Sequence, residues 1–129
     1  VVAKGLGGPE VLILRTNKKR GQFWQNITGG LKKDETPLAG ALRELAEEPG
    51  IKALRLIDLQ WNFSFPSRSN PEIKVTEYGF LCCIDDKIQI TLDRKEHEDF
   101  KWVPINQIGP DHFKFPSNYE AFITALHFL

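Results

Sequence analysis

The sequence lacks several features that would place it in a particular class. It has no methionine, only two cysteines, and no net charge, because 17 acidic side chains balance 17 basic ones. The longest apolar runs, Val11–Leu14 and Phe80–Ile84, are far shorter than the roughly 20 residues that span a bilayer, so we expect no membrane partner. Zero net charge gives no broad attraction to nucleic acid, and we expect no nucleic-acid partner. Because position 1 is not methionine, we expect residues to precede Val1 in the full protein.

Cysteine occurs only as the adjacent pair Cys82-Cys83, inside an apolar stretch. Neighbouring side chains of a strand point to opposite faces and cannot easily form a disulfide. We therefore expect two buried core thiols. Together with the lack of a recognisable signal peptide, this predicts a reducing, cytoplasmic location.

What is present is a composition typical of one globular domain. The 129 residues are 41% hydrophobic and 26% charged, which predicts a single domain over 1–129 with a real core. Strands are expected at Val1–Lys4, Val11–Arg15, Ile51–Phe65, Val75–Ile84, Lys87–Leu92 and Phe100–Val103. Helices are expected at Thr36–Glu48 and Ser117–Leu129, the second with a capping box at Ser117–Glu120. The expected class is a mixed α/β domain.

The central helix has well-defined ends. Thr36 suits the N-cap, and Pro37 suits the first helical position, where a missing N–H costs nothing. Pro49 ends the helix and biases Glu48 away from helical conformation, and Gly50 can adopt a left-handed turn. Its apolar face is formed by Leu38, Ala41, Leu42 and Leu45.

Three glutamates crowd the C-terminal half of this helix. The i, i+3, i+4 spacing puts Glu44, Glu47 and Glu48 on one face, where they repel one another and the helix dipole disfavours anions. A Mg²⁺ ion prefers carboxylate oxygens and would relieve both penalties, and Arg43 can brace the cluster from one turn before Glu47. Because glutamate is a good helix former, an ordinary solvated acidic face is the alternative interpretation.

The segment from Gly29 to Ile51 matches a longer pattern, since a Gly-Gly turn and Glu35 precede the helix and a Gly-Ile exit follows it. The pattern Gly-x5-Glu-x7-Arg-Glu-U-x-Glu-Glu-x-Gly-U, with U a bulky aliphatic residue, is the Nudix box. Its defined positions are filled by Gly29, Glu35, Arg43, Glu44, Leu45, Glu47, Glu48, Gly50 and Ile51. The chain therefore resembles the Nudix hydrolases. Phe23-Trp24-Gln25 and Glu96-His97 resemble the branch of dihydroneopterin triphosphate diphosphatases and dATP pyrophosphohydrolases.

This resemblance implies a fold and a chemistry. The fold is an α/β/α sandwich, a mixed sheet between helices, with the box as a loop–helix–loop. The reaction is Mg²⁺-dependent hydrolysis, with Mn²⁺ as a substitute, in which water attacks phosphorus in a nucleoside diphosphate linked to another group. The implied metal ligands are Glu44, Glu47, Glu48, Glu96 and a backbone carbonyl at Gly29 or Thr28. The implied catalytic residues are Arg43, Glu44, Glu47 and Glu96.

Roles within this set follow the family pattern. Glu44 or Glu96 is the candidate base, and the sequence does not separate them. Arg43 is expected to hold Glu44 or Glu47, with Glu35 holding Arg43 in turn. A plain surface charge is the alternative for Glu96. We interpret His97 as a structural partner rather than a base.

The expected substrate is a small nucleoside or pterin triphosphate. Arg15 is the candidate for meeting the polyphosphate, Trp24 for stacking on the ring, and Gln25 for reading the ring edge. A solvated basic loop and a core tryptophan are the alternatives. The runner-up functions are hydrolysis of dinucleoside polyphosphates or nucleoside diphosphate sugars, a catalytically silent Nudix-like nucleotide-binding module, and a non-enzymatic cation-binding or acidic interaction helix. We expect a monomer or homodimer.

Overall fold

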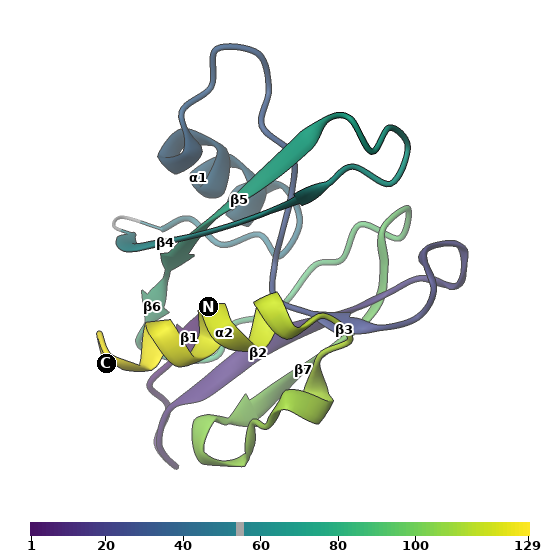
Figure 1. Cartoon of the computed structure of the whole chain (residues 1–129). Coiled ribbons are helices and arrows are strands. Elements are labelled where there is room, and N and C mark those ends of the chain that lie inside the picture. The colour runs from purple at the N-terminus through teal and green to yellow at the C-terminus, as the bar shows by residue number, and fades with distance from the viewer. Residues whose placement is uncertain (54–55) are drawn as a thin grey trace.

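The computed structural model describes residues 1–53 and 56–129. These residues form seven strands and two α-helices, joined in part by short 3₁₀ turns, and Figure 1 shows their arrangement. The strands are β1 Val2–Ala3, β2 Glu10–Thr16, β3 Trp24–Gln25, β4 Ile57–Pro66, β5 Lys74–Leu81, β6 Cys83–Ile84 and β7 His97–Pro104. The helices are α1 Pro37–Glu47 and α2 Pro116–Leu126, and the 3₁₀ turns are Lys18–Arg20, Ile105–Gln107 and Pro110–His112.

Strand β2 is the centre of a five-stranded mixed sheet. It pairs along its whole length with β7, and its other edge pairs with β1 and β3, all antiparallel. Strand β6 joins β1 in parallel, which makes the sheet mixed. Strands β4 and β5 form a separate antiparallel hairpin. The strands expected at Val1–Lys4 and Val11–Arg15 are confirmed as β1 and β2, which form an antiparallel hairpin.

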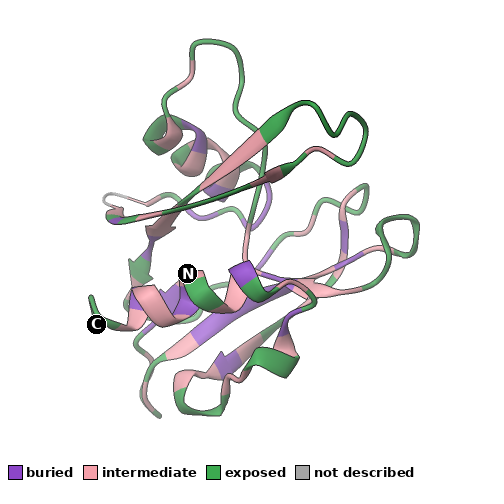
Figure 2. Cartoon of the chain, in the orientation of Figure 1, coloured by how far each residue is buried: buried purple, intermediate pink, exposed green. Residues whose placement is uncertain are grey.

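Alternation along β2 divides the core into two clusters, one on each face of the sheet. Leu12 and Leu14 pack with Leu45 and Ile51 from the end of the α1 segment. On the opposite face, Val11 and Ile13 share a cluster with residues of α2, including Phe122 and Ala125. Figure 2 shows this buried strip along β2. The sheet therefore lies between helical segments, and the expected sandwich is confirmed.

Helix α1 begins and ends close to the expected residues. The Thr36 hydroxyl accepts the Ala39 N–H, Pro37 opens the helix, and Gly50 is left-handed with φ of 76°. The expectation for Glu48 is wrong: its φ of −99° and ψ of −71° are helical, because its N–H still donates to the Glu44 carbonyl. The predicted apolar face is buried only in part, at Leu45; Leu38 and Leu42 stay 46% and 36% exposed.

Two other predicted elements differ at their ends. The strand expected at Ile51–Phe65 starts at Ile57, since 51–53 are irregular and 54–55 lie outside the described residues. The second helix begins at Pro116, with Phe115 as N-cap and no side-chain cap. The predicted capping box at Ser117–Glu120 is therefore wrong, because Ser117 lies buried within the first turn.

Two predicted strands between residues 75 and 92 also differ from the structure. Lys87–Leu92 alternates in polarity but forms no strand, because it pairs with no strand among the described residues and buries only Ile90. The strand expected at Val75–Ile84 is interrupted at Cys82, which is buried, while Cys83 is exposed in β6. The prediction of two buried thiols is thus wrong for one of them. Among the described residues, every helix falls short of the length and apolar character that a membrane crossing requires.

Candidate functional site

Arg43 connects the loop before α1 to the carboxylates on it. Its Nε and Nη2 donate to the two oxygens of Glu35, each at 2.8 Å, and Nη2 also donates to the Gly30 carbonyl at 2.8 Å. Its Nη1 donates to Glu44 at 2.9 Å and to Glu47 at 3.2 Å. The expected contacts are therefore present: Glu35 holds Arg43, and Arg43 holds both helix glutamates.

Charge and hydrogen bonding reinforce this brace. Hydrogen bonds from Arg43, and then from the Lys32 N–H, lower the pKa of Glu35 to about 2. The same carboxylates raise the pKa of Arg43 above its ordinary value, through Glu35 first and Glu44 next. A fork of donors facing a planar carboxylate is the geometry that arginine provides and lysine does not.

Two glycines let the loop approach the helix. A Cβ atom at Gly29 would collide with the Glu44 carboxylate, so the glycine opens the space in which that carboxylate lies. Gly40, one turn before Glu44, would collide with the Leu31 side chain if it carried a Cβ atom. Gly40 is not a defined position of the box, so the box pattern does not predict its packing role. A glycine inside a helix was the signal for it, since glycine is unfavourable there without a packing reason.

Beyond α1, the Glu48 side chain turns inward and is only 5% exposed. One of its oxygens accepts the Asp93 N–H at 3.3 Å, and the other lies against His97 Nδ1. His97 is fully enclosed, and its Nε2 lies 2.9 Å from the Gln25 amide nitrogen. With that amide as donor, Nε2 is the acceptor, and a neutral ring carries its proton on Nδ1, facing Glu48.

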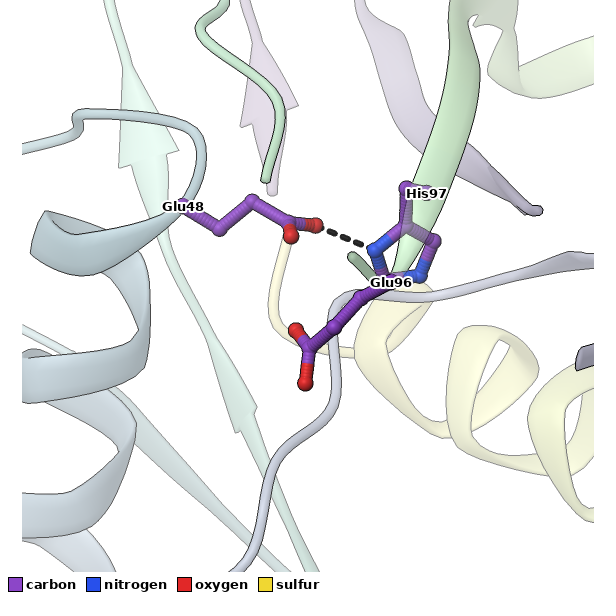
Figure 3. Close-up of side chains that lie close together, drawn as sticks. All are labelled: Glu48, Glu96 and His97. Atoms are coloured by element: carbon purple, nitrogen blue, oxygen red, sulfur yellow. Dashed lines mark ion pairs between the residues drawn. The ribbon is translucent and has the colours of Figure 1, made fainter. Parts of the chain in front are cut away.

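Glu96 completes a three-residue cluster with Glu48 and His97, shown in Figure 3. One ligand atom from each lies within 4.8 Å of the others. The Glu96 carboxylate also accepts a hydrogen bond from Arg20 at 3.3 Å. Burial first, and the charge of Glu96 next, raise the pKa of Glu48 to about 7. Burial lowers the pKa of His97 from its ordinary value.

The donors of this cluster fit a divalent cation. Two converging carboxylates, one of them buried, repel each other, and Arg20 contacts the Glu96 member of the pair. His97 Nδ1 is buried and makes no hydrogen bond of regular geometry, although it lies against Glu48. Carboxylate oxygens suit Mg²⁺ and Mn²⁺, and imidazole suits transition metals.

The sequence-predicted metal ligands thus lie in two groups. Glu48 and Glu96 converge with His97. Glu44 and Glu47 bind Arg43 instead, with Glu44 lying against Gly29. The sequence predicts His97 only as a structural partner, and it does not predict Arg20 as a contact of Glu96. The pairing of Glu96 and His97 in the sequence was the available signal for the first.

The three predicted substrate residues lie on two faces of the sheet. Arg15 and Trp24 are cross-strand partners on the α2 side, whereas Gln25 follows Trp24 and points the other way, to His97. Arg15 pairs with Glu98 at 3.7 Å. The ammonium of Lys101 lies 4.4 Å from the centre of the Trp24 ring, so one face of that ring is occupied by a cation. The structure does not bring all three side chains to one surface.

Comparison with known proteins bears on this geometry. The model of the NUDIX domain family matches residues 2–126. The chain is 38% identical over 107 residues to an octanoyltransferase of Myxococcus xanthus, covering 81% of this chain but only 29% of that protein. It is 33% identical over 110 residues to an RNA pyrophosphohydrolase of Zymomonas mobilis, covering 74% of this chain and 70% of that one.

A solved structure gives the same result for the fold. The dihydroneopterin triphosphate pyrophosphohydrolase of E. coli superposes with a TM-score of 0.78 at 27% identity, over 93% of this chain and 87% of that one. The box residues, the mixed sheet between helices and the family match over nearly the whole chain agree. This chain belongs to the NUDIX domain family.

Proposed function

We propose that this chain, as one Nudix domain over 1–129, is a metal-dependent pyrophosphohydrolase of nucleoside or pterin triphosphates. The observation that carries the proposal is the convergence of Glu48, Glu96 and His97 beyond the end of α1. A cytoplasmic location belongs to the same proposal and is supported by two free thiols. Relatives named as pyrophosphohydrolases support the reaction class.

The proposed metal is Mg²⁺, with Mn²⁺ as a substitute. Glu48 and Glu96 would hold it, and Glu44, Glu47 and the backbone at Gly29 are proposed to contribute on the Arg43 side. The bound ion would neutralise phosphate charge and lower the pKa of a coordinated water. His97 would fix the Glu48 carboxylate by facing one of its oxygens, a positioning role typical of groups behind a metal ligand.

The remaining residues are proposed to transfer a proton, orient the carboxylates or contact the substrate. Glu44 or Glu96 would take the proton of the attacking water, as phosphorus is attacked and a phosphate or diphosphate leaves. Arg43 would keep Glu44 and Glu47 oriented, and Glu35 would keep Arg43 in place. Arg15 is proposed to meet the polyphosphate when it exchanges its contact with Glu98 for the substrate. Trp24 would border the ring, and Gln25 would act through His97.

The test is a substrate panel with a choice of cations. GTP, ATP, dihydroneopterin triphosphate, a dinucleoside polyphosphate, a nucleoside diphosphate sugar and a 5′-triphosphorylated RNA would each be incubated with Mg²⁺, Mn²⁺ or Ca²⁺. We expect product release with Mg²⁺ from the small triphosphates, scored as diphosphate or phosphate. If the RNA is the one substrate of the panel that is hydrolysed, the result would favour the substrate named for the RNA pyrophosphohydrolase relatives.

Binding to the folded protein gives a second readout. Mg²⁺ at 100 times its dissociation constant should stabilise the fold by about 2.7 kcal/mol, seen as a higher melting temperature. Stabilisation without any turnover would favour the catalytically silent binding module. A melting curve that does not respond to millimolar Mg²⁺ would contradict the metal site.

A further inference from the structure

Strand β4 carries a row of aromatic rings on one face. Trp61, Phe63 and Phe65 occupy alternate positions, so their side chains leave the same side of the hairpin. The ring centres of Trp61 and Phe63 are 6.5 Å apart with planes 12° from parallel, and those of Phe63 and Phe65 are 6.0 Å apart at 28°. Phe63 is 38% exposed, so the row is open to a ligand at its middle ring.

Glycine on the neighbouring strand shapes this row. A Cβ atom at Gly79 of β5 would lie 3.1 Å from the Trp61 ring, closer than ordinary contact. Without that side chain, the indole lies over the β5 backbone. Trp61 is thereby held in place as the inner end of the row, packed on the core cluster that contains Ile13.

A carboxylate faces the row from β5. Glu77 is the direct cross-strand partner of Phe63, and such partners project their side chains from the same face. Glu77 is half-buried, and burial is the only cause that raises its pKa. Within residues 1–53 and 56–129, its carboxylate makes no hydrogen bond or ion pair that offsets this burial. A half-buried carboxylate among rings has unused acceptor capacity for two N–H groups.

The row lies on the side of the sheet that carries Arg15 and Trp24, two of the three candidate substrate residues. Trp61 and Trp24 both pack against the same core cluster, on the α2 side of the sheet. At the tip of the hairpin, the Arg68 guanidinium lies 5.1 Å from the centre of the Phe115 ring, next to the start of α2. In Figure 1 the β4–β5 hairpin lies above α2, and both strands of the hairpin contact that helix. A ring bound on β4 would thus lie on the same side as Arg15.

We propose that the Trp61–Phe63–Phe65 row and Glu77 bind a fused ring with an N–H beside an amino group, as in guanine and pterins. The rings would stack on the planar ligand, and the two carboxylate oxygens would accept the adjacent N–H donors. Adenine presents one donor beside an acceptor, so it leaves one carboxylate oxygen facing a lone pair. This inference rests on the proposed function and names the substrate ring that the same enzyme would select.

The experiment compares guanine and adenine substrates in matched variants. In wild type, we expect kcat/KM for GTP and for dihydroneopterin triphosphate to exceed that for ATP. Glu77→Gln should lower the GTP-to-ATP ratio by roughly 5- to 150-fold, the discrimination of one two-point ring contact, because glutamine offers one donor and one acceptor. Phe63→Ala should raise KM for all ringed triphosphates and spare inorganic tripolyphosphate. The bound guanine could belong to free GTP or to the 5′ end of an RNA. Comparing GTP with a 5′-triphosphorylated oligonucleotide that begins with guanosine distinguishes these two sources.

Two controls come from the same hairpin. Glu72→Gln removes an exposed carboxylate from the turn, and Tyr78→Ala removes a ring that is 52% exposed on the opposite face. Neither should change the GTP-to-ATP ratio. An unchanged ratio in Glu77→Gln, or equal rates of GTP and ATP in wild type, would overturn the inference.

Binding without turnover separates this inference from the proposed function. Calorimetry with GMP, AMP and neopterin, in the presence of a chelator, reports ring recognition with no metal chemistry. We expect GMP and neopterin to bind wild type more tightly than AMP, and Glu77→Gln to lose that preference. If the enzyme hydrolyses nothing but this preference holds, only the proposed function fails. If neither GMP nor neopterin binds better than AMP, ring selection by Glu77 is wrong.

Discussion

The carboxylates around Arg43 and the carboxylate of Glu48 share one helix segment but have opposite environments. Arg43 donates four hydrogen bonds to Glu35, Glu44 and Glu47 and a fifth to the Gly30 carbonyl, and the pKa of Glu35 falls to about 2. Glu48 is buried beside Glu96, and its pKa rises to about 7. In the first region one guanidinium contacts all three carboxylates, whereas in the second the buried Glu48 carboxylate contacts the Asp93 N–H and the His97 ring.

This difference suggests that the two regions have different roles, one in orienting side chains and the other in binding a metal ion. A hydrogen-bonded ion-pair network keeps its geometry with no ligand present, so it suits Glu35 and Arg43, which are proposed to orient Glu44 and Glu47. Converging carboxylates with an imidazole nearby gain most from an added cation, so they suit a metal-binding role. Substitutions at the two regions should therefore act differently on turnover and on the stability of the metal-free protein.

The largest effect is expected for Glu48→Gln. Losing one proposed metal ligand should lower kcat by more than ~100-fold, since partners behind a ligand already cost 10–100-fold. The metal-free variant should melt at or above the wild-type temperature at pH 8, because burial disfavours the charged carboxylate. Steady-state kinetics and thermal melts in chelator measure both. Glu120→Gln, an exposed position of α2, is the control; unfolding, or full activity at saturating Mg²⁺, would refute the ligand assignment.

Arg43→Lys should have a smaller effect on kcat and a larger one on stability. Lysine keeps the charge but loses the planar fork that binds both Glu35 oxygens. We expect kcat to fall by roughly 10- to 100-fold, and the free energy of unfolding of the metal-free protein to decrease. Urea titration in chelator measures the second. Arg94→Lys, where a single hydrogen bond to the Glu98 carbonyl is at stake, is the matched control. Loss of turnover with wild-type stability would show that Arg43 does not brace the fold.

Gly29→Ala tests the loop that faces Glu44. The new methyl group would push the Glu44 carboxylate aside, and a misplacement of 1 Å costs up to about 100-fold. Because the side chain is flexible, we expect a loss on the order of 10-fold in kcat and little change in melting temperature. Gly30→Ala is the control, since a methyl group there meets open space and the carbonyl bound by Arg43 is retained. Equal effects of the two substitutions would place the cause in the loop backbone rather than at Glu44.

The Arg43 region could be predicted from the sequence, and the Glu48 region only in part. All contacts of Arg43 lie between Gly30 and Glu47, so helix spacing and one short loop define them. The contact of Glu48 with His97 needs the segment before β7 to fold back onto the end of α1. The spacing of residues within α1 does not predict this long-range contact.

The mistaken elements share a physical cause: each depends on a partner that the sequence pattern does not name. Lys87–Leu92 has the alternation of a strand but pairs with no strand within residues 1–53 and 56–129. Cys83 lies in an apolar run yet is exposed, because β6 pairs only with the short β1 at the margin of the sheet. Adjacent positions of a strand face opposite ways, which separates Trp24 from Gln25 although they form one sequence motif.

The smallest expected effect concerns acid stability at Glu35. Hydrogen bonds from Arg43 hold the pKa of Glu35 at about 2, below its ordinary value of 4.5. A carboxyl with a lowered pKa in the folded state adds stability above pH 4.5, and that contribution is lost as the pH falls toward 2. The melting temperature of the metal-free wild type should therefore fall more steeply between pH 4.5 and 2 than that of Glu35→Gln, measured by circular dichroism. Glu72→Gln, which removes an exposed carboxylate from the β4–β5 turn, should follow the wild-type curve. Parallel curves for wild type and Glu35→Gln would mean that Arg43 adds no stability through this carboxylate. The Arg43 and Glu48 regions would then differ in their effect on turnover alone.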